Sequence, residues 1–331
     1  MARWLVRTAF GNADIKYLGL EMKESIYILC ATDNNYAPYC GVMLSSVFES
    51  NIGSRVKAYV LIDKPMDRRN INRFDRLAKK FGGSIVFVMV DNSFLGKFPI
   101  KGMEYWSIAT YYRLYAAELL PKDIHCILYL DCDIIVQGDL RSLWELDMTD
   151  KAVAGVSDIY ECCGKFQRQL HYSEEVGYFN AGVLLINLDY WREYAIGQQL
   201  LDFLANHYDL VEANDQDVLN AVLWDKKALL PLTYNYQIQF RKKYFYLKSS
   251  EKMRQEIDST TEPVIIHYAA PQKPWNIKYY KMPFKQVWWY YKRKSPWWYL
   301  LPQLPKHKTV NYLVKRYLLW PLGVKYEQLY I

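Results

Sequence analysis

Apolar and polar positions alternate along the chain in a pattern that predicts strands separated by helices. Short apolar runs typical of buried strands occupy residues 26–31, 56–62, 84–90, 126–130, 183–188 and 264–267. Helix-like apolar spacing covers residues 38–50, 67–81, 104–117 and 215–224. Because strand and helix follow each other repeatedly, the sequence predicts an α/β fold in which helices cover a parallel sheet.

Polar clusters follow three of the predicted strands. They are residues 31–36, residues 131–133 and residues 267–273. In an open parallel sheet, ligands bind at the carboxyl ends of the strands, where the loops leave backbone groups free. We therefore expect the binding site at these clusters.

Two of the clusters hold residue types that bind metal ions. Asp131 and Asp133 are two positions apart in an extended segment, so both carboxylates point to the same side and can reach one ion. Oxygen ligands favour Mg²⁺ or Mn²⁺, and a sugar-nucleotide diphosphate would fill the open positions of such an ion. An imidazole from His267 would shift the preference toward Mn²⁺. Lys273 could supply a charge to a phosphate, whereas the alternative is that His267 is structural and Lys273 only solvated.

Several common enzyme classes lack their expected motifs in this chain. We find no GxGxxG, GxxxxGK[ST], HExxH or GxSxG pattern, which disfavours dehydrogenases, P-loop NTPases, zincins and α/β-hydrolases. No apolar stretch of about 18 residues occurs, and charged or polar residues interrupt the first 24 positions. Neither a transmembrane helix nor a signal peptide is expected, so we predict a cytoplasmic protein.

The cysteines follow no metal-binding or disulfide spacing. The chain has six, and Cys30 and Cys126 lie within apolar runs. We expect reduced thiols in the core, with a disulfide or zinc framework as the alternative.

The positive charge is concentrated at the C-terminus. Residues 273–331 hold 12 Lys and Arg against one acid, which leaves 30 basic and 34 acidic residues before them. Six of the 11 Trp also lie there. Aromatic and basic residues together favour binding to an anionic membrane surface. A basic helical cap packed on the domain is the alternative, and nucleic-acid binding is not expected because no nucleic-acid module accompanies the tail.

Six segments in order resemble glycosyltransferase family 8, the retaining galactosyl- and glucosyltransferases that include bacterial lipopolysaccharide enzymes. The matching segments are residues 30–36, 111–114, 128–135, 178–188, 214–220 and 267–275. The resemblance implies a Rossmann-like GT-A fold with a mixed central sheet and a helical C-terminal tail. Together with the change in composition near residues 271–274, it divides the chain into an N-terminal extension at 1–24, a glycosyltransferase domain at 25–275 and a membrane-associating tail at 276–331.

The resemblance also implies roles for particular residues. The ligands of Mn²⁺, with Mg²⁺ as an alternative, would be Asp131, Asp133 and His267. The uridine pocket would be lined by Ala31, Asp33, Asn35 and Tyr36. The donor sugar would be held by Arg113, Asn180, Ala181, Gly182, Asp215 and Gln216. Lys273 would contact the diphosphate, and Ala270 stands where lipopolysaccharide members often have Gly.

These roles describe transfer of galactose or glucose from a UDP-sugar to a saccharide acceptor, a lipopolysaccharide or another lipid-linked glycan, at the inner face of a bacterial membrane. Asp215 and Gln216 would stabilise the oxocarbenium-like sugar. A neutral Gln is a poor nucleophile, so attack by the acceptor on the same face is favoured, with the departing phosphate as base. A sugar-1-phosphate nucleotidyltransferase and a membrane-bound sugar-nucleotide sensor without turnover are the alternatives.

Overall fold

The computed structural model describes most of the chain between the two termini. The described residues are 23–91, 93, 95–98, 100–101, 107–160, 164–269, 271–276, 279 and 281–303. Most of the predicted N-terminal extension, the end of the predicted tail, Cys162, Cys163 and Ala270 lie outside them. The cysteines with free thiols in the described part are Cys30, Cys40, Cys126 and Cys132. Cys30, Cys40 and Cys132 are buried as predicted, whereas Cys126 is only partly buried.

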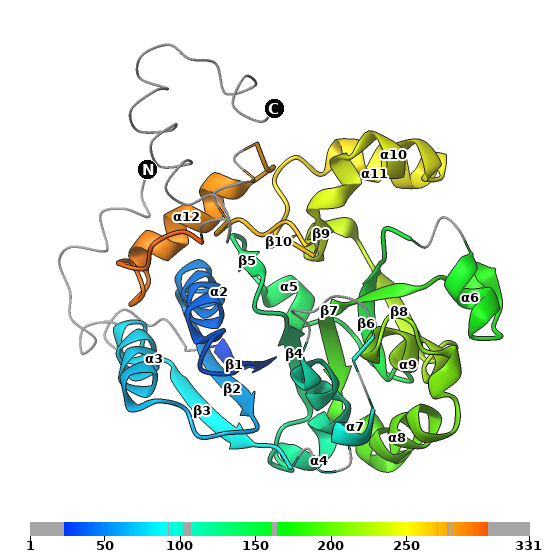
Figure 1. The fold of residues 1–331 in the computed structure, drawn as a ribbon, viewed down its shortest axis with the longest axis horizontal. Coiled ribbons are helices and arrows are strands. Elements are labelled where there is room, and N and C mark those ends of the chain that lie inside the picture. Colours follow the sequence, from blue (N-terminus) through cyan, green and yellow to red (C-terminus); the bar gives the residue numbers. More distant parts are fainter. Residues whose placement is uncertain are drawn as a thin grey trace.

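A seven-stranded mixed sheet forms the centre of the molecule (Figure 1). In chain order its strands are β1 (Lys23–Ala31), β2 (Ser54–Ile62), β3 (Ser84–Met89), β4 (Cys126–Leu130), β6 (Val153–Ser157), β7 (Phe179–Asn187) and β8 (Lys227–Leu230). Their order in space is β3-β2-β1-β4-β7-β6-β8. The predicted parallel sheet is wrong for β7, which runs antiparallel to β4 and β6, whereas the other pairings are parallel. A mixed sheet, as the family resemblance implies, is confirmed.

A second sheet of three short strands adjoins the first. It contains β5 (Ile134–Val136), β9 (Tyr236–Gln237) and β10 (Ile265–His267) in the order β5-β10-β9. The strand predicted at 264–267 therefore exists, but it lies outside the main sheet. Only residues 131–133 separate β4 from β5, so this short turn leads from one sheet to the other.

Helices cover both faces of the main sheet and bury a separate apolar core on each side. The first face carries α2 (Ala37–Ser50), α3 (Arg68–Lys80) and α5 (Arg141–Trp144). The second face carries the 3-10 helix η3 (Ile108–Tyr115), α4 (Ala116–Leu119), α7 (Leu188–Glu193), α8 (Ile196–Asn206) and α9 (Asp215–Val222). Side chains alternate between the two faces of a strand, so Ile28 joins the first core and Leu29 the second.

The helix predicted at 104–117 is wrong in type over its described part. The 3-10 helix η3 occupies most of that part, and α4 begins only at Ala116. The four consecutive side chains of residues 111–114 are all buried. An α-helix that lies on a surface buries one stripe only, whereas this segment is enclosed by several elements.

The beginning of the predicted tail packs against the body of the protein. In α12 (Lys285–Lys294), Trp288 and Tyr291 join an apolar cluster with Val42 of α2 and with residues of the second sheet. Trp297 is buried at 1% exposure, and its ring occupies the space above Gly41, which has no side chain. The neighbouring Trp298 is 65% exposed. Within the described part of the chain, no helix is long and apolar enough to span a membrane.

Candidate functional site

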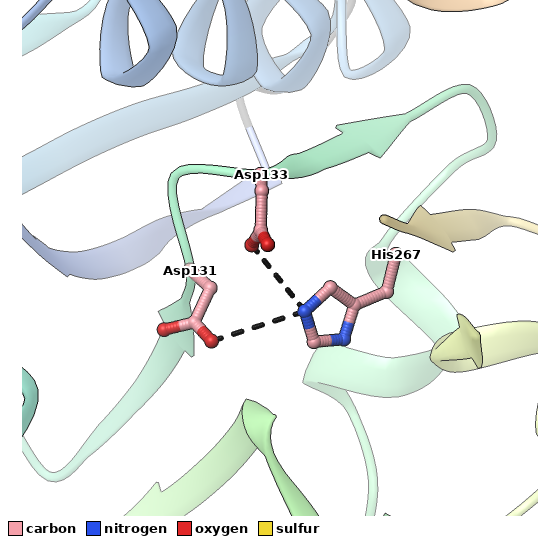
Figure 2. Close-up of side chains that lie close together, drawn as sticks. All are labelled: Asp131, Asp133 and His267. Atoms are coloured by element: carbon pink, nitrogen blue, oxygen red, sulfur yellow. Dashed lines mark ion pairs between the residues drawn. The ribbon is translucent and has the colours of Figure 1, made fainter. Parts of the chain in front are cut away.

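Asp131, Asp133 and His267 form a compact group of side chains (Figure 2). Asp131 and Asp133 lie in the turn from β4 to β5, and His267 ends β10. The Nε2 atom of His267 is 3.9 Å from Asp131 Oδ2 and 3.3 Å from Asp133 Oδ1. One potential ligand atom of each residue lies within 4.8 Å of the other two. The fold therefore brings the three predicted metal ligands together from two different sheets.

Hydrogen bonds determine which nitrogen of His267 carries the proton. Asn235 Nδ2 donates to Asn180 Oδ1 at 2.9 Å, so Asn235 Oδ1 faces the imidazole, where it lies 2.9 Å from Nδ1. An amide oxygen can only accept, so Nδ1 carries a hydrogen, and Nε2, which faces the two carboxylates, is the nitrogen that can bind a metal ion. The donor set of two carboxylates and one neutral imidazole fits Mn²⁺ or Mg²⁺.

Lys273 stands beside one of the carboxylates. Its Nζ atom forms an ion pair with Asp133 Oδ2 and donates to the Tyr268 carbonyl at 2.9 Å. Burial disfavours the charged form of Asp133, but Lys273 and His267 outweigh it and hold the pKa of that carboxyl below its ordinary value. Asp133 is therefore ionised at neutral pH, and a cation lies next to the candidate metal site, where it can meet a phosphate.

Arg113 connects the candidate metal site to Asp215. Its buried guanidinium lies 3.0 Å from Asp131 Oδ1 and 3.0 Å from Asp215 Oδ2. It also donates to the Ala181 carbonyl and lies over the Tyr129 ring, 3.8 Å from the ring centroid. These contacts fix the guanidinium between two acids that the sequence separates widely.

Asp215 is a buried carboxyl whose two oxygens have different partners. Its Oδ1 atom accepts a hydrogen bond from Thr110. Its Oδ2 atom lies in the ion pair with Arg113 but receives no hydrogen bond from the described residues, because the nearby Nε–H donates to the Thr110 carbonyl. Burial raises the pKa of Asp215 to about 6, although Arg113 and Thr110 oppose the shift. Asp215 Oδ2 is therefore a buried acceptor that interacts with Arg113 through charge.

The side-chain amide of Gln216 is held in one orientation. Its Oε1 atom accepts from Asn180 Nδ2 at 3.1 Å and from the Ala181 N–H at 3.0 Å. Its Nε2 atom donates to Asp158 Oδ2 at 3.2 Å and to the Tyr178 hydroxyl at 3.1 Å. Both predicted catalytic residues, Asp215 and Gln216, therefore lie in one polar network with the predicted donor-sugar residues.

Gly182 makes room for the candidate metal ligands. A Cβ atom on this residue would lie 2.2 Å from His267 Cε1 and 2.9 Å from Asp131 Oδ2. Its carbonyl accepts the Asp131 N–H at 2.9 Å. The close packing of backbone against imidazole requires a residue without a side chain at this position.

The predicted uridine-pocket residues lie at the end of β1 and in the loop from β1 to α2, next to the candidate metal site. The Ala31 carbonyl accepts a hydrogen bond from the Cys132 thiol at 3.2 Å, which ties this loop to the turn that carries both acids. Asp33 Oδ1 accepts the Tyr36 N–H at 2.7 Å, and Asn35 is exposed in the same loop. The Tyr36 ring meets Trp275 edge-on, with centroids 6.0 Å apart. These residues are adjacent to the other clusters, as expected from the strand ends.

Three residues of the network were not found by sequence reasoning. Asp158 directly follows the buried strand β6, so the rule that selected Asp131 could have selected it. Burial raises the pKa of its carboxyl, and hydrogen bonds from Asn180 and Gln216 partly offset this. Tyr178 and Asn235 gave no local signal, because their importance depends on partners far away in the sequence.

Comparison with known proteins identifies related chains over most of this length. The family model described as glycosyl transferase family 8 matches residues 27–278. General stress protein A of Bacillus subtilis is 31% identical over 277 residues, covering 81% of this chain and 93% of that protein. The lipopolysaccharide 1,3-galactosyltransferase of Salmonella typhimurium is 29% identical over 268 residues, covering 80% and 77%.

A solved structure supports the same grouping. The galactosyltransferase LgtC, crystallised with donor and acceptor sugar analogues, superimposes with a TM-score of 0.72 at 26% sequence identity. The match covers 86% of this chain and 99% of that chain. The two proteins therefore share one α/β architecture with a mixed central sheet.

Proposed function

The chain belongs to glycosyl transferase family 8, and from this premise we propose that it is a metal-dependent, retaining hexosyltransferase. It transfers galactose or glucose from a UDP-sugar to a saccharide acceptor. The observation that carries the proposal is the group of Asp131, Asp133 and His267 with Lys273 beside it. Two carboxylates and an imidazole would hold Mn²⁺ or Mg²⁺, and the ion supplies positive charge to the leaving diphosphate. Lys273 adds a second charge at the same place.

The residues around Gln216 support the sugar end of the proposal. Asp215 is next to Gln216 in the chain, and its carboxylate is held by Arg113 and Thr110 at the sugar end of the proposed site. Gln216 Oε1 is fixed in direction by Asn180 and Ala181 and offers a partial negative charge to an oxocarbenium-like sugar. We favour attack by the acceptor on the same face of the sugar, with retention of configuration. A covalent sugar adduct on Asp215 or Gln216 would contradict this mechanism.

We further propose a lipopolysaccharide or another lipid-linked glycan as the acceptor, and a location on the inner face of a bacterial membrane. Two of the similar proteins are named lipopolysaccharide 1,2-glucosyltransferase and lipopolysaccharide 1,3-galactosyltransferase. The lipid contact is assigned to exposed residues of the tail, because Trp288 and Trp297 belong to the core. The exposed set is Tyr290, Trp298, Tyr299 and Leu301.

The reaction is tested with a panel of UDP-sugars and a mixture of soluble saccharide acceptors. Turnover of one donor should need Mn²⁺ or Mg²⁺, stop with a chelator, and fall by about 10³-fold or more in an Asp131→Asn/Asp133→Asn variant. An Asp75→Asn/Asp225→Asn variant, which removes two exposed acids, is the matched control. UDP-sugar binding without turnover under all these conditions would replace the enzyme by the sensor alternative.

A further inference from the structure

A basic and apolar surface on α10 (Lys243–Lys248) has no role in the site described above. Tyr244 and Leu247 are 60% and 61% exposed and lie three positions apart, so they share one face of the helix. Lys243 and Lys248 lie within one turn of this pair, and Lys248 Nζ is 2.9 Å from the Tyr244 hydroxyl. The sequence from 226 to 250 contains no Asp or Glu. The surface therefore combines two large apolar side chains with two lysines.

The opposite side of α10 is anchored to the protein. Phe245 and Tyr246 pack on an apolar cluster that contains Ile257, and the Tyr246 hydroxyl donates to Asp258 at 2.6 Å. Tyr244 and Leu247 are thus presented outward on a fixed support. A single exposed apolar residue is ordinary, but a supported pair with adjacent lysines is typical of elements that lie at a membrane surface.

The helix is connected both to the candidate site and to α12. The Phe245 ring meets the Tyr160 ring edge-on, with centroids 5.2 Å apart, and the Tyr160 N–H donates to Asp158 of the Gln216 network at 2.9 Å. On the other side, the Arg241 guanidinium lies 5.0 Å from the centroid of Phe284, the N-cap of α12. Figure 1 shows α10 and α12 along the same edge of the molecule.

We propose that α10 is a second membrane contact, which binds anionic phospholipid and brings the wall of the candidate site to the lipid surface. The proposal rests on the function proposed above, in which the tail supplies the first contact. One contact fixes the protein to a membrane but leaves it free to tilt, whereas two separated contacts define which side faces the lipid. Charge complementarity selects an anionic surface, since Arg241, Lys242, Lys243 and Lys248 all lie at this helix.

The test is co-sedimentation of the full chain with vesicles of phosphatidylcholine, alone or with about one third phosphatidylglycerol. The wild-type protein should bind the anionic vesicles and bind phosphatidylcholine at least about tenfold more weakly. Lys243→Glu/Lys248→Glu and Tyr244→Ser/Leu247→Ser should each weaken binding to anionic vesicles by about tenfold or more. Lys122→Glu/Lys226→Glu, which reverses two exposed lysines outside α10, should change binding by less than about twofold.

Hydrolysis of the UDP-sugar, measured in the same samples, separates the possible failures. All α10 variants should keep the wild-type rate, because none of the changed residues lies in the candidate site. Binding by both α10 variants equal to that of the wild type would overturn the α10 contact and leave the tail contact intact. No binding by the wild-type protein would remove both contacts. If the wild-type protein binds vesicles as expected but does not hydrolyse any UDP-sugar, the proposed enzymatic function would be refuted and the proposed membrane contact of α10 would stand.

Discussion

Replacing Gly182 with alanine should disable the candidate metal site through one added carbon. The new Cβ would lie 2.2 Å from His267 Cε1 and 2.9 Å from His267 Nδ1. Ordinary van der Waals contact begins near 3.4 Å, so the imidazole must retreat by about 1 Å. It has little room to do so, because His267 is 2% exposed and its Nδ1 is bonded to Asn235. Metal ligands tolerate displacements of only about 0.2 Å.

We expect Gly182→Ala to weaken Mn²⁺ binding by about 100-fold, which corresponds to about 2.8 kcal/mol. Affinity is measured by titrating Mn²⁺ in the presence of UDP and following the free ion by electron paramagnetic resonance. Urea unfolding of the metal-free protein reports whether the variant still folds.

Gly155→Ala is the matched control for this substitution. It adds the same carbon to a strand glycine, but the nearest atoms to the new Cβ would belong to Leu184 and Phe179, at 3.2 Å from each. Its Mn²⁺ affinity should stay within about twofold of the wild type. A folded Gly182→Ala protein with wild-type Mn²⁺ affinity would show that His267 is not a ligand, and the reasoning about this site would be wrong.

Three further predictions concern buried charge and burial in the tail. Arg113→Met should cost about 3–5 kcal/mol in urea unfolding, because it leaves the buried Asp215 unpaired. Arg141→Met, which removes an exposed ion pair, should cost less than about 1 kcal/mol, and equal losses would contradict this. Burial raises the pKa of Asp215 to about 6, so the folded state binds this proton more tightly than the unfolded state. The wild type should therefore lose about 3 kcal/mol of stability relative to Asp215→Asn as the pH rises from about 3 to about 7, and parallel pH profiles would refute the shift. Because Trp297 is buried and Trp298 is exposed, Trp297→Ala should cost about 3–5 kcal/mol and Trp298→Ala less than about 0.5 kcal/mol in the same assay. The reverse order would show that Trp298, not Trp297, is the buried residue.

The sequence determined the elements that depend on neighbouring residues. The strand predicted at 126–130 matches β4 at both ends, and α3 lies within the predicted helix at 67–81. Apolar periodicity is a local property, so it survives without knowledge of partners. The acids at 131 and 133 could be singled out for the same reason. Two charged residues directly after a buried strand are costly without a cation, and this pattern is visible in neighbouring residues alone.

The tertiary structure decided which distant residues meet. The direction of β7 and the place of β10 in a second sheet depend on pairing partners, which hydrophobic periodicity does not specify. The protonated nitrogen of His267 depends on Asn235, which is 32 positions away. No sequence pattern encodes that contact, because it arises only when two separate strands lie side by side.

The adjacent residues Trp297 and Trp298 also show that the sequence does not determine which side chains are buried. Composition assigns both to a membrane-seeking tail, yet Trp297 fills the space above Gly41 and Trp298 is exposed. The difference arises from the surface on which the tail packs. There, Gly41 of α2 has no side chain, and Phe74 of α3 contacts the Trp297 ring edge-on. The sequence by itself determined that the tail is rich in tryptophan and lysine, and packing against distant helices decided which of these side chains remain available for a partner.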